Sequence, residues 1–374
     1  MLTHFIRTLV LILLPSIALG QSLNLSVLPP TSNNSPSTFL LEDGEISINS
    51  GSLQFLTSGK TAAGFNAYGI SPDYSFVSFL KGTPNGGQFV LLDSSGDTLN
   101  SYSTISLTSD DPSLAVYPSN AGTILIRDNI VNFTFYNTFG EIITSMSSSG
   151  ETKGGQVISE VAMSPNRETV VIYTPKIRRN GELGSKAEVM LRNGDFETIF
   201  FSNDRTLNYL GISGNGNLVV AISSAQGTDD RAVIMDKFGN ELNTITSGEN
   251  LIGASFTDNG EFITLYSDQR VLVFNTMTGE RLGSTSFRSP VLVADYFPED
   301  DMILTLIGDY YESTGIINNA EFRAVDLEQR ELASEELSGA LGFNQAMKPK
   351  FIRTGTGEYR LMGANKRVAI STNF

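Results

Sequence analysis

The sequence predicts an all-β protein that folds as a single β-propeller of about seven four-stranded blades, with six or eight blades also compatible. Three observations lead to this prediction. A unit of four short strand-like runs recurs along most of the chain, two kinds of turn recur in phase with those runs, and no segment shows a sustained helical period with capping residues. We expect a closed ring, because closure removes unpaired strand edges.

The clearest unit spans residues 251–287. Its four runs cover residues 252–256, 261–266, 270–275 and 281–287, and they are rich in β-branched and aromatic residues. Four antiparallel strands within about 40–50 residues is the size of one propeller blade. The unit therefore predicts the blade.

Two turns separate the strands of this unit. Thr257-Asp258-Asn259-Gly260 joins the first two runs, because Asn and Gly tolerate the positive φ of tight turns. Related first turns recur at residues 71–73, 117–119, 164–166, 213–215, 297–299 and 354–355. The second turn, at residues 276–279, recurs at residues 93–97, 137–141, 192–195 and 236–241, and residues 326–329 are a copy without glycine.

The N-terminal segment has the features of a secretory signal peptide. Arg7 lies in a positive region, residues 9–14 form a short apolar core, and Ala18 and Gly20 mark a cleavage site before Gln21. The chain has no cysteine, so neither disulfides nor a cysteine-linked lipid is expected. We therefore expect residues 1–20 to be removed and the protein to be exported to a bacterial periplasm, outer surface or medium.

The remaining chain divides into a short lead-in and one domain. Residues 21–38 are rich in Ser, Asn and Pro and are expected to be a flexible lead-in, and residues 39–374 form the propeller domain. Near the C-terminus, residues 351–353, 358–362 and 367–372 supply three strands only. We expect an N-terminal strand within residues 39–55 to join this C-terminal blade and close the ring.

These units resemble the WD40-like and YVTN-type β-propeller repeats of exported bacterial proteins. The turns at residues 71–73 and 164–166, of the SPD and SPN type, and the D/N-x-x-G turns carry the resemblance. The chain has no Trp and its one histidine is His4, so it lacks the Trp-Asp and Gly-His pairs of true WD40 repeats. The resemblance implies a propeller fold and no specific activity.

The mature chain lacks the side chains of several enzyme classes. Signal cleavage removes His4, which leaves no histidine and no cysteine. This excludes a Ser-His-Asp triad, a Cys nucleophile and the usual zinc sites. We therefore favour a non-catalytic protein and expect no cofactor, no catalytic residue and no metal site.

Carboxylate chemistry is the one alternative that composition allows. Acidic clusters occur at Asp110-Asp111, Asp229-Asp230 and Glu299-Asp300-Asp301. Paired carboxylates could serve a hydrolase or lyase that acts on a polysaccharide in the propeller channel, or could bind Ca²⁺. Because all three clusters lie in predicted turns or loops, solvated turn residues are the preferred interpretation.

The loops predict where a partner binds. The mature chain has 24 basic and 40 acidic residues, a net charge of −16, which disfavours nucleic acid as a partner. The connections between second and third strands are long at residues 81–87, 174–186, 224–231 and 307–320. Long loops on one rim of a rigid scaffold are typical recognition surfaces, and Arg and Tyr are favoured interface anchors.

The sequence therefore predicts a scaffold protein that binds a protein or peptide through this loop-bearing face. We expect a monomer without an integral membrane span. The candidate partner-binding residues share a place in these long connections: Lys176, Arg178, Arg179, Lys186, Asp229, Asp230, Arg231, Tyr310 and Tyr311.

Overall fold

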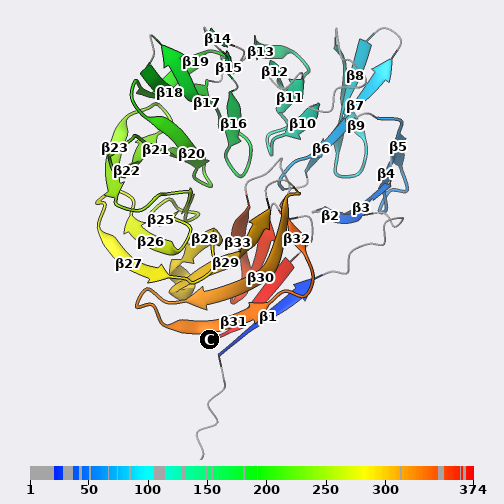
Figure 1. Cartoon of the computed structure of the whole chain (residues 1–374). Coiled ribbons are helices and arrows are strands. Elements are labelled where there is room, and N and C mark those ends of the chain that lie inside the picture. Colours follow the sequence, from blue (N-terminus) through cyan, green and yellow to red (C-terminus); the bar gives the residue numbers. More distant parts are fainter. Residues whose placement is uncertain are drawn as a thin grey trace, which may run out of the picture.

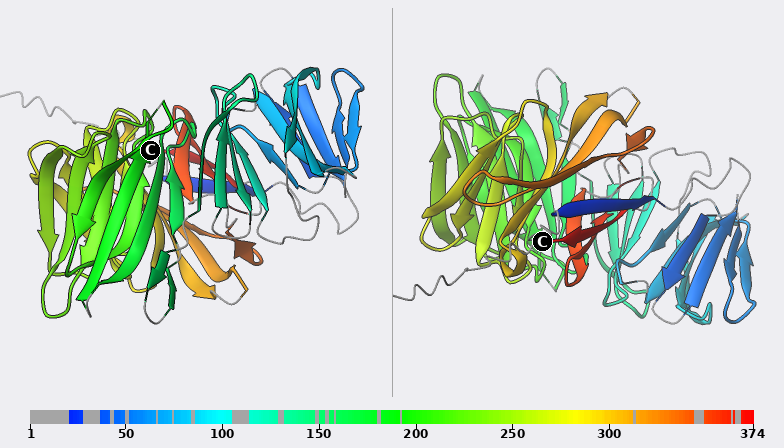
Figure 2. Two further views of the ribbon diagram at one scale, coloured as in Figure 1. Left: turned by 90° about the horizontal axis from the view of Figure 1, so that it is seen from above. Right: turned by 90° about the horizontal axis from the view of Figure 1, so that it is seen from below.

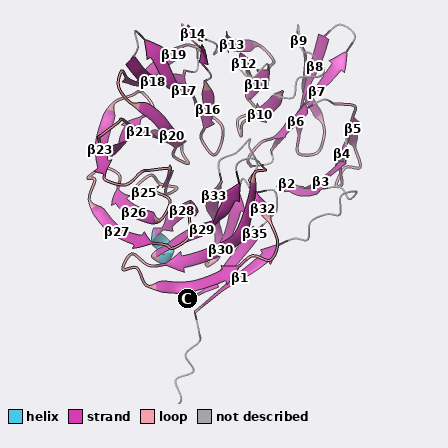
Figure 3. Ribbon diagram, viewed as in Figure 1, coloured by secondary structure: helices cyan, strands magenta, loops and turns pink. Residues whose placement is uncertain are grey.

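The computed structural model describes residues 21–27, 37–41, 44–49, 52–65, 67–73, 75–83, 86–104, 114–128, 132–147, 150–152, 155–157, 159–179, 182–191, 193–311, 314–343, 349–362, 364 and 368–374. The predicted signal peptide lies outside these residues, and so do Asp110 and Asp111. Within the described part, the chain is all-β, and its one helical element is the short 3-10 helix η1 (Pro298–Asp300) (Figure 3).

The described strands form eight antiparallel sheets of four or more strands, arranged around a centre that the first strand of each sheet faces (Figure 1). We number them blades 1 to 8. Blade 1 consists of β2 (Ser37–Leu41), β3 (Gly44–Asn49), β4 (Ser52–Phe55) and β5 (Thr61–Ala63), and blade 2 of β6 (Ala67–Ile70), β7 (Phe76–Thr83), β8 (Gly86–Asp93) and β9 (Thr98–Thr104). Blade 3 consists of β10 (Ala115–Pro118), β11 (Ile124–Asp128), β12 (Asn132–Tyr136) and β13 (Ile142–Ser147), and blade 4 of β16 (Glu160–Met163), β17 (Val170–Arg179), β18 (Glu182–Met190) and β19 (Phe196–Ser202).

The second half continues the pattern. Blade 5 consists of β20 (Thr206–Ile212), β21 (Leu218–Ser224), β22 (Asp230–Asp236) and β23 (Glu241–Ser247), and blade 6 of β24 (Gly253–Phe256), β25 (Phe262–Tyr266), β26 (Arg270–Asn275) and β27 (Arg281–Ser286). Blade 7 consists of β28 (Val291–Phe297), β29 (Met302–Tyr311), β30 (Ile316–Val325) and β31 (Glu331–Glu336), and blade 8 of β33 (Lys350–Gly355), β34 (Glu358–Met362), β35 (Val368–Asn373) and β1 (Ser22–Val27). A hairpin of β14 (Gly150–Thr152) and β15 (Gly155–Val157) precedes blade 4, and β32 (Leu341–Gly342) pairs with β30.

The propeller fold and its repeat unit are confirmed. The four strands of blade 6 fall where the unit at residues 251–287 predicts them. The described sheets number one more than seven, because the chain builds an additional blade from β2–β5. Figure 2 shows blades 1 and 2, in blue and cyan, set off from the plane of the green and yellow blades.

Apolar side chains join the blades in sequence. Seven buried clusters each contain residues from two consecutive blades, from blades 1 and 2 through to blades 7 and 8. Between blades 5 and 6, for example, Val220 and Ile222 belong to the same cluster as Phe256 and Ile263. A fully buried side chain of this kind stabilises the fold by roughly 1.5–3 kcal/mol. The inter-blade layers are therefore the hydrophobic core.

An N-terminal strand completes the C-terminal blade, but it is a different strand from the one expected. β1 pairs with β35 over six residue pairs, from Ser22 with Asn373 to Val27 with Val368. It therefore lies in the segment expected to be a flexible lead-in. The stretch at residues 39–55 instead contributes β2, β3 and β4 to blade 1. Leu23 of β1 is 4% exposed and belongs to the cluster between blades 7 and 8, which explains why β1 is held there.

The two ends of the blades form two different faces. We call the turn face the one where first strands join second strands and third strands join fourth strands. We call the loop face the opposite one, where second strands join third strands and blade follows blade. In Figure 2, the orange hairpin β29–β30 projects from the loop face.

Three of the four connections expected to be long loops are strand extensions. β7 and β8 pair as far as Thr83 with Gly86, β17 and β18 as far as Arg179 with Glu182, and β29 and β30 as far as Tyr311 with Ile316. Register shifts at Thr174/Ile177 and Ile307/Asp309 interrupt the regular pattern within two of these hairpins, which hides their pairing in the sequence. Only residues 225–229 lie between paired strands as a true loop.

Candidate functional site: the loop face and its groove

The turn face is built from a repeated hydroxyl contact. At the end of several first strands, the hydroxyl of a buried Ser or Thr accepts a hydrogen bond. The donor is the backbone N–H of a residue at the start of the second strand. The pairs are Ser71 with Phe76 (2.9 Å), Ser164 with Thr169 (3.0 Å), Ser213 with Leu218 (3.0 Å) and Thr257 with Phe262 (3.1 Å). Each contact satisfies a buried backbone donor, so this face has a largely fixed geometry.

Contacts between turns link neighbouring blades on this face. The Asp73 N–H donates to Asn120 Oδ1 at 3.1 Å, and the Asn120 N–H donates to the Asn166 carbonyl at 3.0 Å. Thr169 Oγ1 donates to the Gly216 carbonyl at 3.1 Å. These bonds connect blades 2, 3, 4 and 5 in a chain.

Arg167 makes a long-range contact on the turn face. Its Nη1 donates to the carbonyl oxygens of Ile70 (2.8 Å) and Pro118 (3.1 Å), so a residue of blade 4 bonds to blades 2 and 3. Its guanidinium lies 5.9 Å from the centre of the Tyr117 ring. Burial lowers the pKa of Arg167 to about 10, and the backbone takes a φ of 57°. The position is energetically costly and is held by these contacts.

The turns between third and fourth strands share a second device. In each of four such turns, the side chain of the first residue accepts hydrogen bonds from the backbone N–H groups two and four residues later. The first residues are Asp93, Asn137, Asp236 and Asp326. The residue in the fourth position of each turn has a positive φ, from 78° to 85° at the glycines Gly96, Gly140 and Gly239. In the copy without glycine, Gln329 adopts a φ of 71°.

The loop face carries the features that vary. The hairpins β17–β18 and β29–β30 project there, and the second of them exposes Tyr310 (41%), Tyr311 (51%) and Ile316 (37%). Tyr310 also contacts Phe343, with ring centroids 5.6 Å apart. Aromatic side chains at the end of a paired hairpin are large and pre-ordered, which suits them to contact with a partner.

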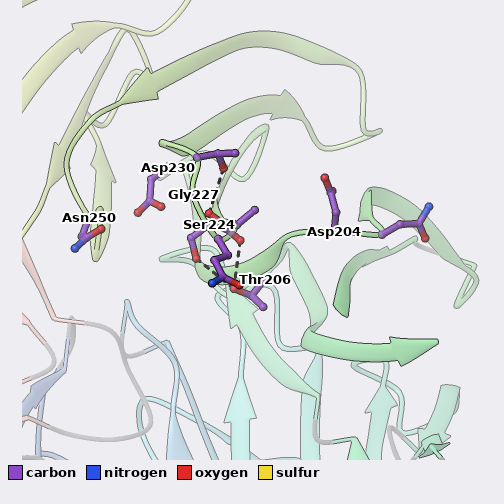
Figure 4. Close-up of a pocket in the computed structure, with 10 residues that line it drawn as sticks. Asp204, Thr206, Ser224, Gly227, Asp230 and Asn250 are labelled. Atoms are coloured by element: carbon purple, nitrogen blue, oxygen red, sulfur yellow. Dashed lines mark hydrogen bonds between the residues drawn. The ribbon is translucent and has the colours of Figure 1, made fainter. Parts of the chain in front are cut away.

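A groove of about 820 Å³ lies at blade 5, next to the blade that carries β17–β18 and two blades from the one that carries β29–β30 (Figure 4). Two of its walls are the connections that enter and leave blade 5, where Asp204 and Asn250 lie, and a third is the loop at residues 225–229. Figure 4 shows Thr206 and Ser224 on its floor, and Thr206 Oγ1 and Ser224 Oγ are 3.2 Å apart. The groove thus presents hydroxyl, amide and carboxylate groups.

Arg205 holds the loop of this groove in place. Its guanidinium donates to Ser223 Oγ (3.0 Å), to the carbonyls of Ser223 (2.7 Å) and Asp229 (2.8 Å), and to Thr228 Oγ1 (3.1 Å). The side chain is 7% exposed, and burial together with the charge of Arg231 lowers its pKa. One buried cation therefore fixes the only true loop among the four long connections.

The structure separates the predicted site residues into exposed and structural ones. Lys176, Asp229, Arg231, Tyr310 and Tyr311 are exposed on the loop face. Their blades are 4, 5 and 7, so the tyrosines lie two blades away from the groove.

The remaining predicted residues serve the hairpins and the loop. Arg178 and Arg179 pair with Leu183 and Glu182 at the end of β17–β18, and their side chains lie outside the described part. Lys186 forms an ion pair with Glu188 at 2.6 Å. Asp230 is 6% exposed and its Oδ2 accepts the Leu251 N–H at 2.8 Å, which makes it a structural residue.

Sequence reasoning missed Arg205, Thr206, Ser224 and Asn250. Arg205 had one available signal, because it is the only basic residue between positions 193 and 230. The other three are small polar residues of a common type, and only the fold brings them together at one groove.

The acidic cluster at residues 299–301 is engaged in the fold. Asp300 accepts hydrogen bonds from Arg353 Nε (2.7 Å), Arg353 Nη2 (3.2 Å) and the Tyr359 hydroxyl. Burial opposes ionisation of Asp300, but the bonds from Arg353 and Tyr359 outweigh it and lower the pKa of this carboxyl. Asp301 accepts from the Tyr296 hydroxyl at 3.3 Å. Within the described ranges, no group of three or more carboxylates forms a site that could hold a metal ion.

The central channel holds carboxylates of unequal exposure. Asp295 is 3% exposed and Glu160 is exposed, and both line the channel. The hydrolase alternative predicts two buried carboxylates that face each other. Among the described residues that line the channel, Asp295 is the only buried carboxylate. The described helical structure contains no segment long and apolar enough to cross a membrane.

Two solved structures illustrate what this chain is similar to. It matches BamB from Moraxella catarrhalis with a TM-score of 0.50 and 14% identity, over 94% of this chain and 100% of that chain. It matches Sqt1 from Saccharomyces cerevisiae with a TM-score of 0.51 and 11% identity, over 88% of this chain and 83% of that chain.

At such low identities the likeness concerns the fold alone. Both are β-propellers, which confirms the predicted propeller fold. No protein-family model and no curated protein matches the sequence.

Proposed function

We propose that the chain is an exported, non-catalytic scaffold that binds a protein or peptide through its loop face. One observation carries this proposal: the two faces differ in design. The turn face uses its polar groups for contacts between blades, and its exposed aromatic tips, Phe139 and Phe238, lie singly in separate blades. The loop face projects extended hairpins, and one of them carries two adjacent exposed aromatic residues, Tyr310 and Tyr311. Exposed aromatic anchors are typical of interaction surfaces.

The fold neighbours support the proposal at a general level. Propellers offer a rigid frame whose connections can vary without disturbing the blades, and this frame is what the chain shares with them. Net negative charge favours a partner with basic groups, because electrostatic complementarity steers association. Lys176 and Arg231 provide local exceptions that could pair with acidic groups.

The test is capture of a partner by variants that differ at one face. In the first variant, the two exposed aromatic residues of β29–β30, Tyr310 and Tyr311, are both changed to serine. The matched control changes two exposed turn-face tips, Phe139→Ser and Phe238→Ser, which are 78% and 55% exposed. The mature chain is used as bait against envelope and medium fractions.

We expect the mature chain and the turn-face control to retain the same partner and the variant with serine at positions 310 and 311 to lose it. Equal capture by all three proteins would reject the loop face as the binding surface. Export has its own test: the N-terminus of the protein recovered outside the cytoplasm should begin at Gln21.

A further inference from the structure

The centre of the propeller contains a cavity that the loop-face proposal does not use. It has a volume of about 460 Å³ and is lined by the first strands of blades 4 to 8, β16, β20, β24, β28 and β33. Cavities of about 300–1,000 Å³ with apolar walls and a few polar groups are the usual size of small-molecule sites. Val161, Leu210 and Val293 are among the apolar residues of its wall.

Tyr266 supplies an open hydrogen-bonding group to this cavity. The side chain is 7% exposed and lines the channel, yet its hydroxyl makes no hydrogen bond with any described residue. Among the described residues, this hydroxyl is not one of the fully enclosed polar atoms that lack a partner, so it faces the open space of the cavity. Burial, with the nearby Tyr209 and Asp295, raises the pKa of Tyr266, so the phenol remains a neutral donor.

A glycine on the inner strand makes room for this ring. A Cβ at Gly253 would lie 2.2 Å from Cζ of Tyr266 and 2.3 Å from its hydroxyl oxygen. Gly253 is not among the residues with positive φ, so its backbone does not itself require glycine. The pair places a second-strand tyrosine over the inner strand, where it reaches the channel.

The charged groups around Tyr266 already have partners. Asp295 accepts hydrogen bonds from the Ser255 hydroxyl and from the Phe351 N–H (2.8 Å). Lys350 donates to the Phe256 carbonyl at 3.2 Å and lies 3.7 Å from Asp258 Oδ1. The open group is thus a neutral hydroxyl.

Three further charged residues of the channel wall are also engaged. The Tyr173 hydroxyl donates to Glu160, Arg167 donates to two backbone carbonyls, and Arg127 is hydrogen-bonded with Tyr117. An additional ionic group in the channel would be desolvated without a free counter-charge, which is costly. A neutral ligand avoids this cost.

We propose that the channel is a binding site for a small neutral polyhydroxylated compound, of the size and chemical class of a mono- or disaccharide, which accepts a hydrogen bond from Tyr266. The hydroxyls of such a compound both donate and accept, so they can meet the phenol and the remaining acceptor sites of Asp295. The aromatic ring of Tyr209, which also lines the cavity, offers an apolar surface to its C–H groups. The site is independent of the loop face.

The experiment is titration of the mature protein, labelled with ¹³Cζ-tyrosine, with D-glucose and with maltose, followed by NMR. D-glucuronate is the charged counterpart of glucose. Tyr266→Phe removes only the hydroxyl and identifies the Tyr266 resonance. Because that hydroxyl has no partner among the residues that the structure describes and faces the cavity, the variant should fold as the wild type does. Tyr310→Phe, on the loop face, is the matched control.

We expect saturable shifts at Tyr266 with a neutral sugar, unchanged binding in Tyr310→Phe, and binding at least about tenfold weaker in Tyr266→Phe, the factor that about 1.4 kcal/mol corresponds to. Glucuronate should bind more weakly than glucose. The proposal is overturned if neither sugar gives a saturable shift in the millimolar range, if Tyr266→Phe binds as tightly as the wild type, or if glucuronate binds more tightly than glucose. The wild-type titrations decide the matter even if a variant fails to fold.

Discussion

The turn face and the loop face of this propeller use the same kinds of residue for different purposes. On the turn face, Arg167 bonds to carbonyls of two other blades and side-chain hydroxyls satisfy backbone donors. On the loop face, Arg205 braces a single loop within its own blade, and Tyr311 projects into solvent. The difference indicates that stability is concentrated on one face and freedom to vary on the other.

Of the changes that test this difference between the faces, replacement of Arg167 should have the largest effect on the free energy of unfolding. Arg167→Ala removes two charge-assisted hydrogen bonds between blades, and we expect a loss of about 3 kcal/mol in the free energy of unfolding. Arg167→Gly should lose about 1 kcal/mol less, because glycine relieves the positive φ. Urea denaturation measures both. A loss below about 0.5 kcal/mol in the alanine variant would mean that the turn face does not hold the blades together.

Asp300 tests the same face through pH. Its pKa is lowered in the folded protein, so its ionised form stabilises the fold above the ordinary value of 3.8, and this contribution disappears as pH falls through the lowered pKa. Asp300→Asn should cost about 2 kcal/mol at neutral pH, through the lost bonds to Arg353 and Tyr359. The difference from wild type should shrink below about pH 4. A difference that is constant with pH would contradict this role.

Gln329 provides a test in which the variant should be more stable than the wild-type protein. It occupies the position that glycine holds in the related turns, with a φ of 71°. Gln329→Gly should raise the free energy of unfolding by about 0.5–1 kcal/mol, because relief of the left-handed strain exceeds the entropy cost of glycine. Thermal unfolding provides the measurement, with Gln226→Gly on the loop face as the control; a lower melting temperature for Gln329→Gly would refute the strain.

Tyr311→Ser is expected to have the smallest effect on the fold. The side chain is 51% exposed, and exposed positions away from special contacts change stability by less than about 0.5 kcal/mol. Its effect should instead appear in partner capture. Loss of more than about 1 kcal/mol would show that the projecting hairpin is part of the core structure.

Much of the architecture could be predicted from the sequence, because each blade repeats the same local chemistry. A turn is predicted by the residue types of Thr257, Asn259 and Gly260 alone, and the strands around this turn coincide with the apolar runs. The closing strand was misplaced because Ser and Asn dominate the composition around it. The period-two spacing of Leu23 and Leu25 was the available signal.

The sites depend on distances that no local pattern contains. Arg205 matters because it reaches the carbonyl of Asp229, which lies 24 residues later. Tyr266 reaches the channel because Gly253, on the neighbouring strand, lacks a side chain. Such pairings follow from register, and register becomes visible only when the strands are assembled.

The pairing of β1 with β35 has a consequence for how the molecule can be attached to anything else. Third strands run toward the turn face, so Asn373 at the end of β35 and Ser22 at the start of β1 meet there, on the side opposite the orange hairpin (Figure 2). Any anchor, tag or surface joined at residue 22 or at residue 373 is therefore attached at the turn face. An anchored molecule would have its turn face toward the anchor and its hairpins directed away from it.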